Sequence, residues 1–138
     1  MDHTSDPIVL FVDDDENILR GLTRVLRNQP YRLFTARSGE EAMRVLMTNH
    51  VSVIVADEQM PGMSGTELLS WIAENCPETM RIVLTGHAST STAIRAINEG
   101  SVFRFFTKPC NEVDLALAIR EAIDAKKTAS GSTTPTSS

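Results

Sequence analysis

Four short apolar runs in this chain end beside polar residues, and this arrangement limits the fold more than any other feature. Three of the runs are followed directly by Asp13, Asp57 and Thr85, and Lys108 comes close behind the fourth. The first three runs are rich in β-branched residues, which is typical of strands buried in a parallel sheet. The carboxyl ends of parallel strands share one edge of the sheet, where α/β proteins place their sites. The sequence therefore predicts that carboxylates, a hydroxyl and an amine meet at that edge.

Apolar runs alternate with helical patterns along most of the chain. Strands are expected at Ile8–Val12, Tyr31–Ala36, Val51–Ala56, Arg81–Leu84 and Val102–Phe106. Helices are expected at Glu16–Asn28, from Ser38 onward, at Thr66–Asn75, at Thr90–Asn98, and from Asn111 to about Lys127. Ser38 and Glu41 have the spacing of a capping box. This repetition predicts an α/β fold, a parallel sheet with helices on both faces and right-handed crossovers.

The size and composition predict one cytoplasmic domain. Residues 8–127 should form it, residues 1–7 should be disordered, and residues 128–138, nearly all Ser, Thr, Gly, Ala and Pro, should be a flexible tail or linker. A net charge of −5 argues against direct binding of nucleic acid. No apolar run approaches the ~20 residues needed to span a membrane. Cys76 and Cys110 lack metal-ligand spacing and are expected to be free thiols.

Three consecutive aspartates follow the first run. Hard dications such as Mg²⁺ take oxygen ligands and keep several waters, so Asp13 and Asp14 are candidate metal ligands. Asp15 is the candidate for a different task, capping the next helix. The alternative that all three only cap the helix stays open on these residues alone.

Asp57, Thr85 and Lys108 suit phosphoryl chemistry. The Asp57 carboxylate can attack phosphorus and hold the phosphoryl group as an acyl phosphate. The Thr85 hydroxyl can donate to a phosphoryl oxygen, and the Lys108 ammonium can neutralise its charge. Each also has a plainer interpretation, since strand-end Asp and Thr residues often cap or turn the chain and most lysines are simply solvated.

Taken together, these motifs resemble the receiver (CheY-like) domain of a two-component response regulator. The resemblance covers roughly residues 8–127 and is carried by Val12-Asp13-Asp14, Asp57 with Met60-Pro61-Gly62, Leu84-Thr85-Gly86 and Thr107-Lys108-Pro109. It implies a doubly wound, flavodoxin-like fold, with five parallel strands in the order 2-1-3-4-5 and five helices. It also implies a phosphoprotein of a phosphorelay that promotes its own phosphorylation and dephosphorylation, rather than a conventional enzyme.

The resemblance assigns a role to each site residue. Asp57 is the phosphoacceptor, Asp13, Asp14 and Asp57 bind Mg²⁺, and the backbone carbonyl of Gln59 is a further metal ligand. Thr85 is the switch hydroxyl and Lys108 pairs with the phosphoryl group. Phe105 stands at the position of the switch aromatic, which is often Tyr, so a hydrogen bond from a ring hydroxyl is absent. Gln59 and His87 flank the expected path of the water that removes the phosphoryl group.

The implied partners are a sensor histidine kinase or phosphotransfer protein, and a C-terminal output domain if the native chain is longer. A stand-alone regulator is the other option. A dimer through the fourth helix, fifth strand and fifth helix is also implied. One enzyme alternative remains: Asp13-Asp14-Asp15 also resembles the Asp-x-Asp of haloacid-dehalogenase-type phosphatases, with Asp13 as nucleophile and Asp15 as general acid. That alternative leaves Asp57 without a role.

Overall fold

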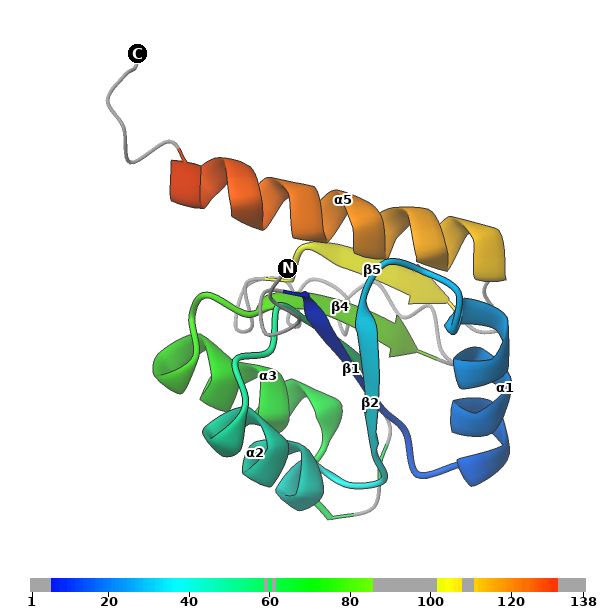
Figure 1. Cartoon of the computed structure of the whole chain (residues 1–138). Coiled ribbons are helices and arrows are strands. Elements are labelled where there is room, and N and C mark those ends of the chain that lie inside the picture. The colour runs from blue at the N-terminus through cyan, green and yellow to red at the C-terminus, as the bar shows by residue number, and fades with distance from the viewer. Residues whose placement is uncertain (1–5, 59, 61, 86–101, 108–110, 132–138) are drawn as a thin grey trace.

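The four apolar runs form four strands of a five-stranded parallel sheet, three of them central and the last at an edge (Figure 1). The computed structural model describes residues 6–58, 60, 62–85, 102–107 and 111–131. Its strands are β1 (Ile8–Val12), β2 (Arg32–Ala36), β3 (Val53–Asp57), β4 (Met80–Thr85) and β5 (Arg104–Thr107). They lie in the order β2-β1-β3-β4-β5, so the predicted flavodoxin-like sheet is confirmed.

Helices cover both faces of this sheet, because alternate side chains of each strand point to opposite sides. Leu10 and Val12 of β1 pack into one core with α2 (Gly39–Thr48) and α3 (Gly65–Asn75). Val9 and Phe11 pack into the other core with α1 (Glu16–Leu26) and α5 (Glu112–Gly131). Every residue of β1 and β3 is buried, which explains why these runs show no polar alternation.

Short polar side chains fix the start of each described helix. Asp15 caps α1 by accepting from the Asn17 amide, as predicted. Ser38 caps α2 by accepting from the Glu41 amide, but Glu41 accepts from the amide of Arg37 rather than from Ser38, so only half of the predicted capping box is present. A complete capping box starts α3 instead, at Ser64 and Glu67.

Several element ends differ from the sequence prediction. Asp57 and Thr85 are the last residues of β3 and β4 rather than the first residues after them, because the Asp57–Leu84 and Thr85–Thr107 pairs extend the ladders. The last helix continues to Gly131, beyond the predicted end near Lys127. The helix expected at residues 90–98 lies outside the described residues. Among the helices that are described, none combines the length and apolar character required to cross a bilayer.

Gly65 lets the start of α3 pack directly on the end of β3. Its amide donates to the Glu58 carbonyl at 2.9 Å. A β-carbon at this position would lie 2.7 Å from the Glu58 Cα and would also meet the Asp57 carbonyl oxygen. Both neighbours are backbone, so neither can move without shifting β3. Gly21, within α1, would meet nothing within 4 Å.

We therefore expect opposite effects from two Gly-to-Ala changes. Gly65→Ala should lower the free energy of unfolding by about 1–3 kcal/mol, the usual cost of overpacking. Gly21→Ala should raise it by about 0.5–1 kcal/mol, because alanine is the better helix former and has fewer unfolded conformations. Urea unfolding followed by circular dichroism measures both. Equal stabilisation by the two changes would contradict the close packing of Gly65.

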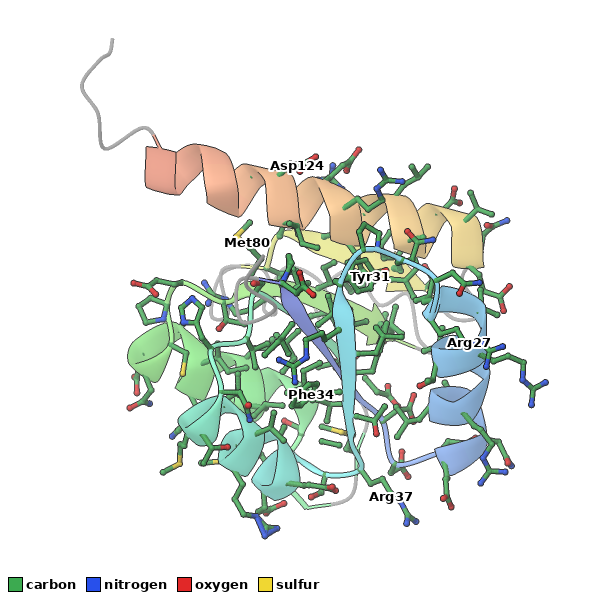
Figure 2. All side chains as sticks on the ribbon, in the orientation of Figure 1. Arg27, Tyr31, Phe34, Arg37, Met80 and Asp124 are labelled. Atoms are coloured by element: carbon green, nitrogen blue, oxygen red, sulfur yellow. The ribbon has the colours of Figure 1, made fainter. Side chains whose placement is uncertain are left out.

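Tyr31 is a buried tyrosine just before β2, on the side of the sheet that α1 and α5 cover (Figure 2). It is 7% exposed, and its hydroxyl has no hydrogen-bond partner within the described part of the chain. Burial raises the pKa of Tyr31 to about 12, and the positive charge of Arg120 offsets only part of this rise.

Tyr31 should make the protein less stable at alkaline pH. The unfolded chain loses the tyrosine proton near pH 10 and the folded chain only near pH 12, so the unfolded state is favoured progressively across that interval. We expect Tyr31→Phe to avoid up to about 2 kcal/mol of this loss and to be no less stable at neutral pH. Urea unfolding between about pH 9 and 12 measures the difference between parent and variant. Because the chain has one tyrosine, ultraviolet absorbance reports its ionisation directly, and a midpoint near 10 would contradict the burial effect.

Candidate functional site

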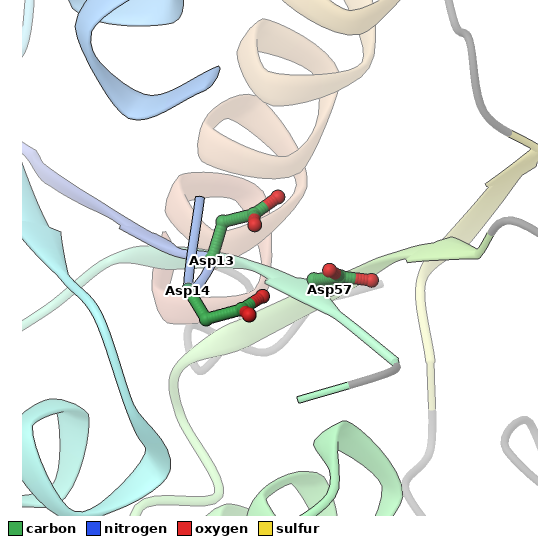
Figure 3. Close-up of side chains that lie close together, drawn as sticks. All are labelled: Asp13, Asp14 and Asp57. Atoms are coloured by element: carbon green, nitrogen blue, oxygen red, sulfur yellow. The ribbon is translucent and has the colours of Figure 1, made fainter. Parts of the chain in front are cut away.

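Three carboxylates meet at the carboxyl ends of β1 and β3 (Figure 3). Val12 pairs with Ala56 across the two strands, so the next residues, Asp13 and Asp57, emerge at the same level. Asp14 follows on the loop. One carboxylate oxygen from each of Asp13, Asp14 and Asp57 lies within 4.8 Å of the others. These three residues therefore lie together, as their positions after the apolar runs predict.

The backbone holds two of these carboxylates inside the protein. Asp13 is 3% exposed and Asp57 is 5% exposed, whereas Asp14 is exposed. The Asp13 amide donates to the Ala36 carbonyl at 3.1 Å, which continues the β1–β2 ladder, and its Oδ1 accepts from the Asp15 amide at 2.9 Å. Asp15 caps α1 and does not join the cluster of three.

The cluster has the chemistry of a site for a hard dication. Oxygen is the ligand type that Mg²⁺ and Ca²⁺ prefer, and Mg²⁺ is commonly held by one or two carboxylates with waters completing the shell. Three mutually close carboxylates also repel one another, and a cation between them would remove that repulsion. The residues present therefore fit a bound Mg²⁺.

Thr85 lies beside this cluster and contacts Glu58, a residue that the sequence pattern did not indicate as part of the site. The Thr85 side chain is fully buried, and its Oγ1 donates to Oε1 of Glu58 at 2.6 Å. Glu58 follows Asp57 directly and is half-buried. The only signal in the sequence is this adjacency, and adjacency alone does not show which way a side chain turns at the end of a strand.

The structure describes only some of the remaining predicted site residues. Gln59, His87 and Lys108 lie outside the described residues. Phe105 is half-buried on β5 and packs against the core on the α2–α3 side of the sheet. Gly62 has a φ of 77°, in the left-handed region that glycine adopts readily, which agrees with a fixed loop after Asp57.

Comparisons with known proteins agree with this geometry. The family model for the response regulator receiver domain matches residues 9–120. The hydrogenase transcriptional regulatory protein HoxA of Cupriavidus necator is 35% identical over 118 residues, which are 86% of this chain and 24% of HoxA. The chain thus spans about a quarter of the length of this curated relative.

Solved structures give the same result. A receiver domain of an HD domain-containing protein from Pseudomonas fluorescens superposes with a TM-score of 0.86 and 35% identity, covering 89% of this chain and 98% of that one. The beryllofluoride-activated NtrC4 receiver domain dimer gives a TM-score of 0.80 and 35% identity, covering 86% of this chain and 98% of that one. These matches do not support the phosphatase alternative.

The repulsion among the carboxylates predicts the effect of removing one charge. Asp14→Asn should raise the free energy of unfolding in a chelator by about 1 kcal/mol, the size of the repulsion between unit charges about 4 Å apart in water. Adding Mg²⁺ should stabilise the parent more than this variant, since binding to the folded state adds to its stability. Asp124→Asn, an exposed change on α5, is the control. Thermal unfolding in chelator and in Mg²⁺ measures this, and identical behaviour of the two variants would argue against the cluster.

Proposed function

This chain belongs to the response regulator receiver domain family, and we propose that it accepts a phosphoryl group on Asp57. The supporting observation is the position of that carboxylate. It is buried at the carboxyl end of the central strand β3, with an oxygen within 4.8 Å of oxygens from Asp13 and Asp14. A carboxylate in this position can act as a nucleophile toward phosphorus while its neighbours hold a cation.

In this proposal the transfer forms an acyl phosphate. An Asp57 oxygen attacks phosphorus, the bond to the donor breaks, and the donor leaves with its electron pair. Asp13, Asp14 and Asp57, with the backbone carbonyl of Gln59, would hold Mg²⁺. When bound, Mg²⁺ would neutralise negative charge that develops on the phosphoryl oxygens. The domain would thereby promote its own phosphorylation and dephosphorylation without being a conventional enzyme.

Thr85 and Lys108 are proposed to bind the phosphoryl group once it is on Asp57. The end of β4 lies next to the end of β3, because Asp57 pairs with Leu84, and this places Thr85 one residue beyond the level of the acceptor. Its hydroxyl would donate to a phosphoryl oxygen, and the Lys108 ammonium would pair with the charge. Phe105 would then move into the space that Thr85 vacates, and the helix predicted at residues 90–98, β5 and α5 would form the readout surface.

A histidine kinase or a phosphotransfer protein is the proposed donor, and an output domain in a longer protein is the proposed target. HoxA, a transcriptional regulatory protein by name, is about four times as long as the region it shares with this chain. The related NtrC4 receiver is described as a beryllofluoride-activated dimer, so we also propose dimerisation through the readout surface. A cytoplasmic location is part of the proposal, and the free thiol of Cys76 suits a reducing compartment.

Phosphorylation by acetyl phosphate tests this function. We expect label on Asp57 that requires Mg²⁺ and is lost completely in Asp57→Asn, because an amide is not a nucleophile toward phosphorus. Asp15→Asn is the matched control, since asparagine caps a helix as well as aspartate does and the site should stay active. Mass mapping after acetyl phosphate treatment gives the labelled residue. Label on Asp13, or full label in Asp57→Asn, would overturn the proposal.

A further inference from the structure

Glu58 has a backbone that is fixed on two sides. Its amide donates to the Leu84 carbonyl at 2.8 Å, which extends the β3–β4 ladder beyond the last paired residue. Its carbonyl accepts from the Gly65 amide at 2.9 Å, at the start of α3. The side chain therefore leaves the backbone at a fixed place beside the end of β4, within reach of Thr85.

The contact between the two side chains has the length of a strong hydrogen bond. The donor is the fully buried Thr85 hydroxyl and the acceptor is a Glu58 carboxyl oxygen, 2.6 Å apart. Hydroxyl donors come this close mainly to carboxylate acceptors, and such bonds are about twice as strong as neutral ones. The half-buried position of Glu58 shields the bond from water and strengthens it further.

A threonine hydroxyl has a single proton to donate. If Thr85 donates it to Glu58, it cannot donate it at the same time to a phosphoryl oxygen on Asp57. We propose that Glu58 is a positioning residue that holds the Thr85 hydroxyl in the unphosphorylated arrangement and competes with the phosphoryl group for it. This inference rests on the proposed function, since it assigns a regulator to the same site.

The competition sets how readily the domain switches. A ligand shifts a two-state equilibrium only by its differential affinity, and its apparent affinity falls with the population of the competent state. By stabilising the unphosphorylated arrangement, Glu58 reduces the population in which Thr85 is available to the phosphoryl group. Loss of the Glu58 acceptor should therefore raise the apparent affinity for a phosphoryl mimic.

Titration of the full chain with beryllofluoride and Mg²⁺, followed by amide shifts of Thr85 and the β5 residues, tests the inference. We expect an apparent affinity higher by on the order of tenfold in Glu58→Ala, given the usual strength of a hydrogen bond to a charged group. Glu58→Gln keeps the shape and an acceptor oxygen but loses the charge, so its increase should be smaller. Glu74→Gln, an exposed change of equal charge on α3, should leave the affinity unchanged.

A double-mutant cycle separates competition for the hydroxyl from direct repulsion between charges. In a Thr85→Ala background, Glu58→Ala should have no further effect, because no hydroxyl remains to be held. An undiminished effect in that background would overturn the inference, as would parental affinity in both Glu58 variants. If these variants still take label on Asp57, the proposed function survives that failure. Absence of label in the parent chain would instead refute the proposed function.

Discussion

The parallel pairing of β1, β3 and β4 is the constraint on which the rest of the site depends. Val12 lies beside Ala56, and Asp57 lies beside Leu84. Side chains alternate between the two faces, so a slip of one residue would turn a whole strand inside out. Both faces of β1 and β3 are buried, so a slip would exchange side chains between two closely packed cores. It would also draw the polar residues at one strand end into the core and push apolar residues out at the other end. The hydrophobic effect thus fixes the register, and the register fixes the positions of the carboxylates.

The same register works against stability at the end of the strands. Asp13 and Asp57 are almost fully buried, although buried carboxylates are costly unless they have partners. The amide of Asp15 supplies one such partner to Asp13. The remaining repulsion among the carboxylates favours binding of a cation to the folded site, whereas the unfolded chain would bind the cation weakly. The proposed affinity for a dication and the loss of metal-free stability would therefore have one physical origin.

Some parts of this arrangement follow from the sequence and others do not. Apolar runs ending in Asp13 and Asp57 were enough to predict a parallel sheet and carboxylates meeting at one edge of it, because buried β-branched runs mark strands and their ends. The order of the strands came from the resemblance to receiver domains. Glu58 could not be found this way, since its partner Thr85 is far away in sequence and the side chain lies where regular alternation stops. The end of α5 was also missed: the small polar residues up to Gly131 have the composition of a linker, yet they continue a helix that has already formed.

Burial across the sheet indicates where a structural change can occur. β1 and β3 are buried along their full length, and close packing there opposes any shift. β5 is an edge strand whose residues are half-buried or exposed, and Phe105 contacts one core while Phe106 contacts the other. Thr85 joins these two regions, since it ends β4 between the rigid strand β3 and the less constrained strand β5. A change in the hydrogen bond of its hydroxyl acts at that boundary, so its consequences should pass toward β5 and α5 while the carboxylates of β1 and β3 keep their positions.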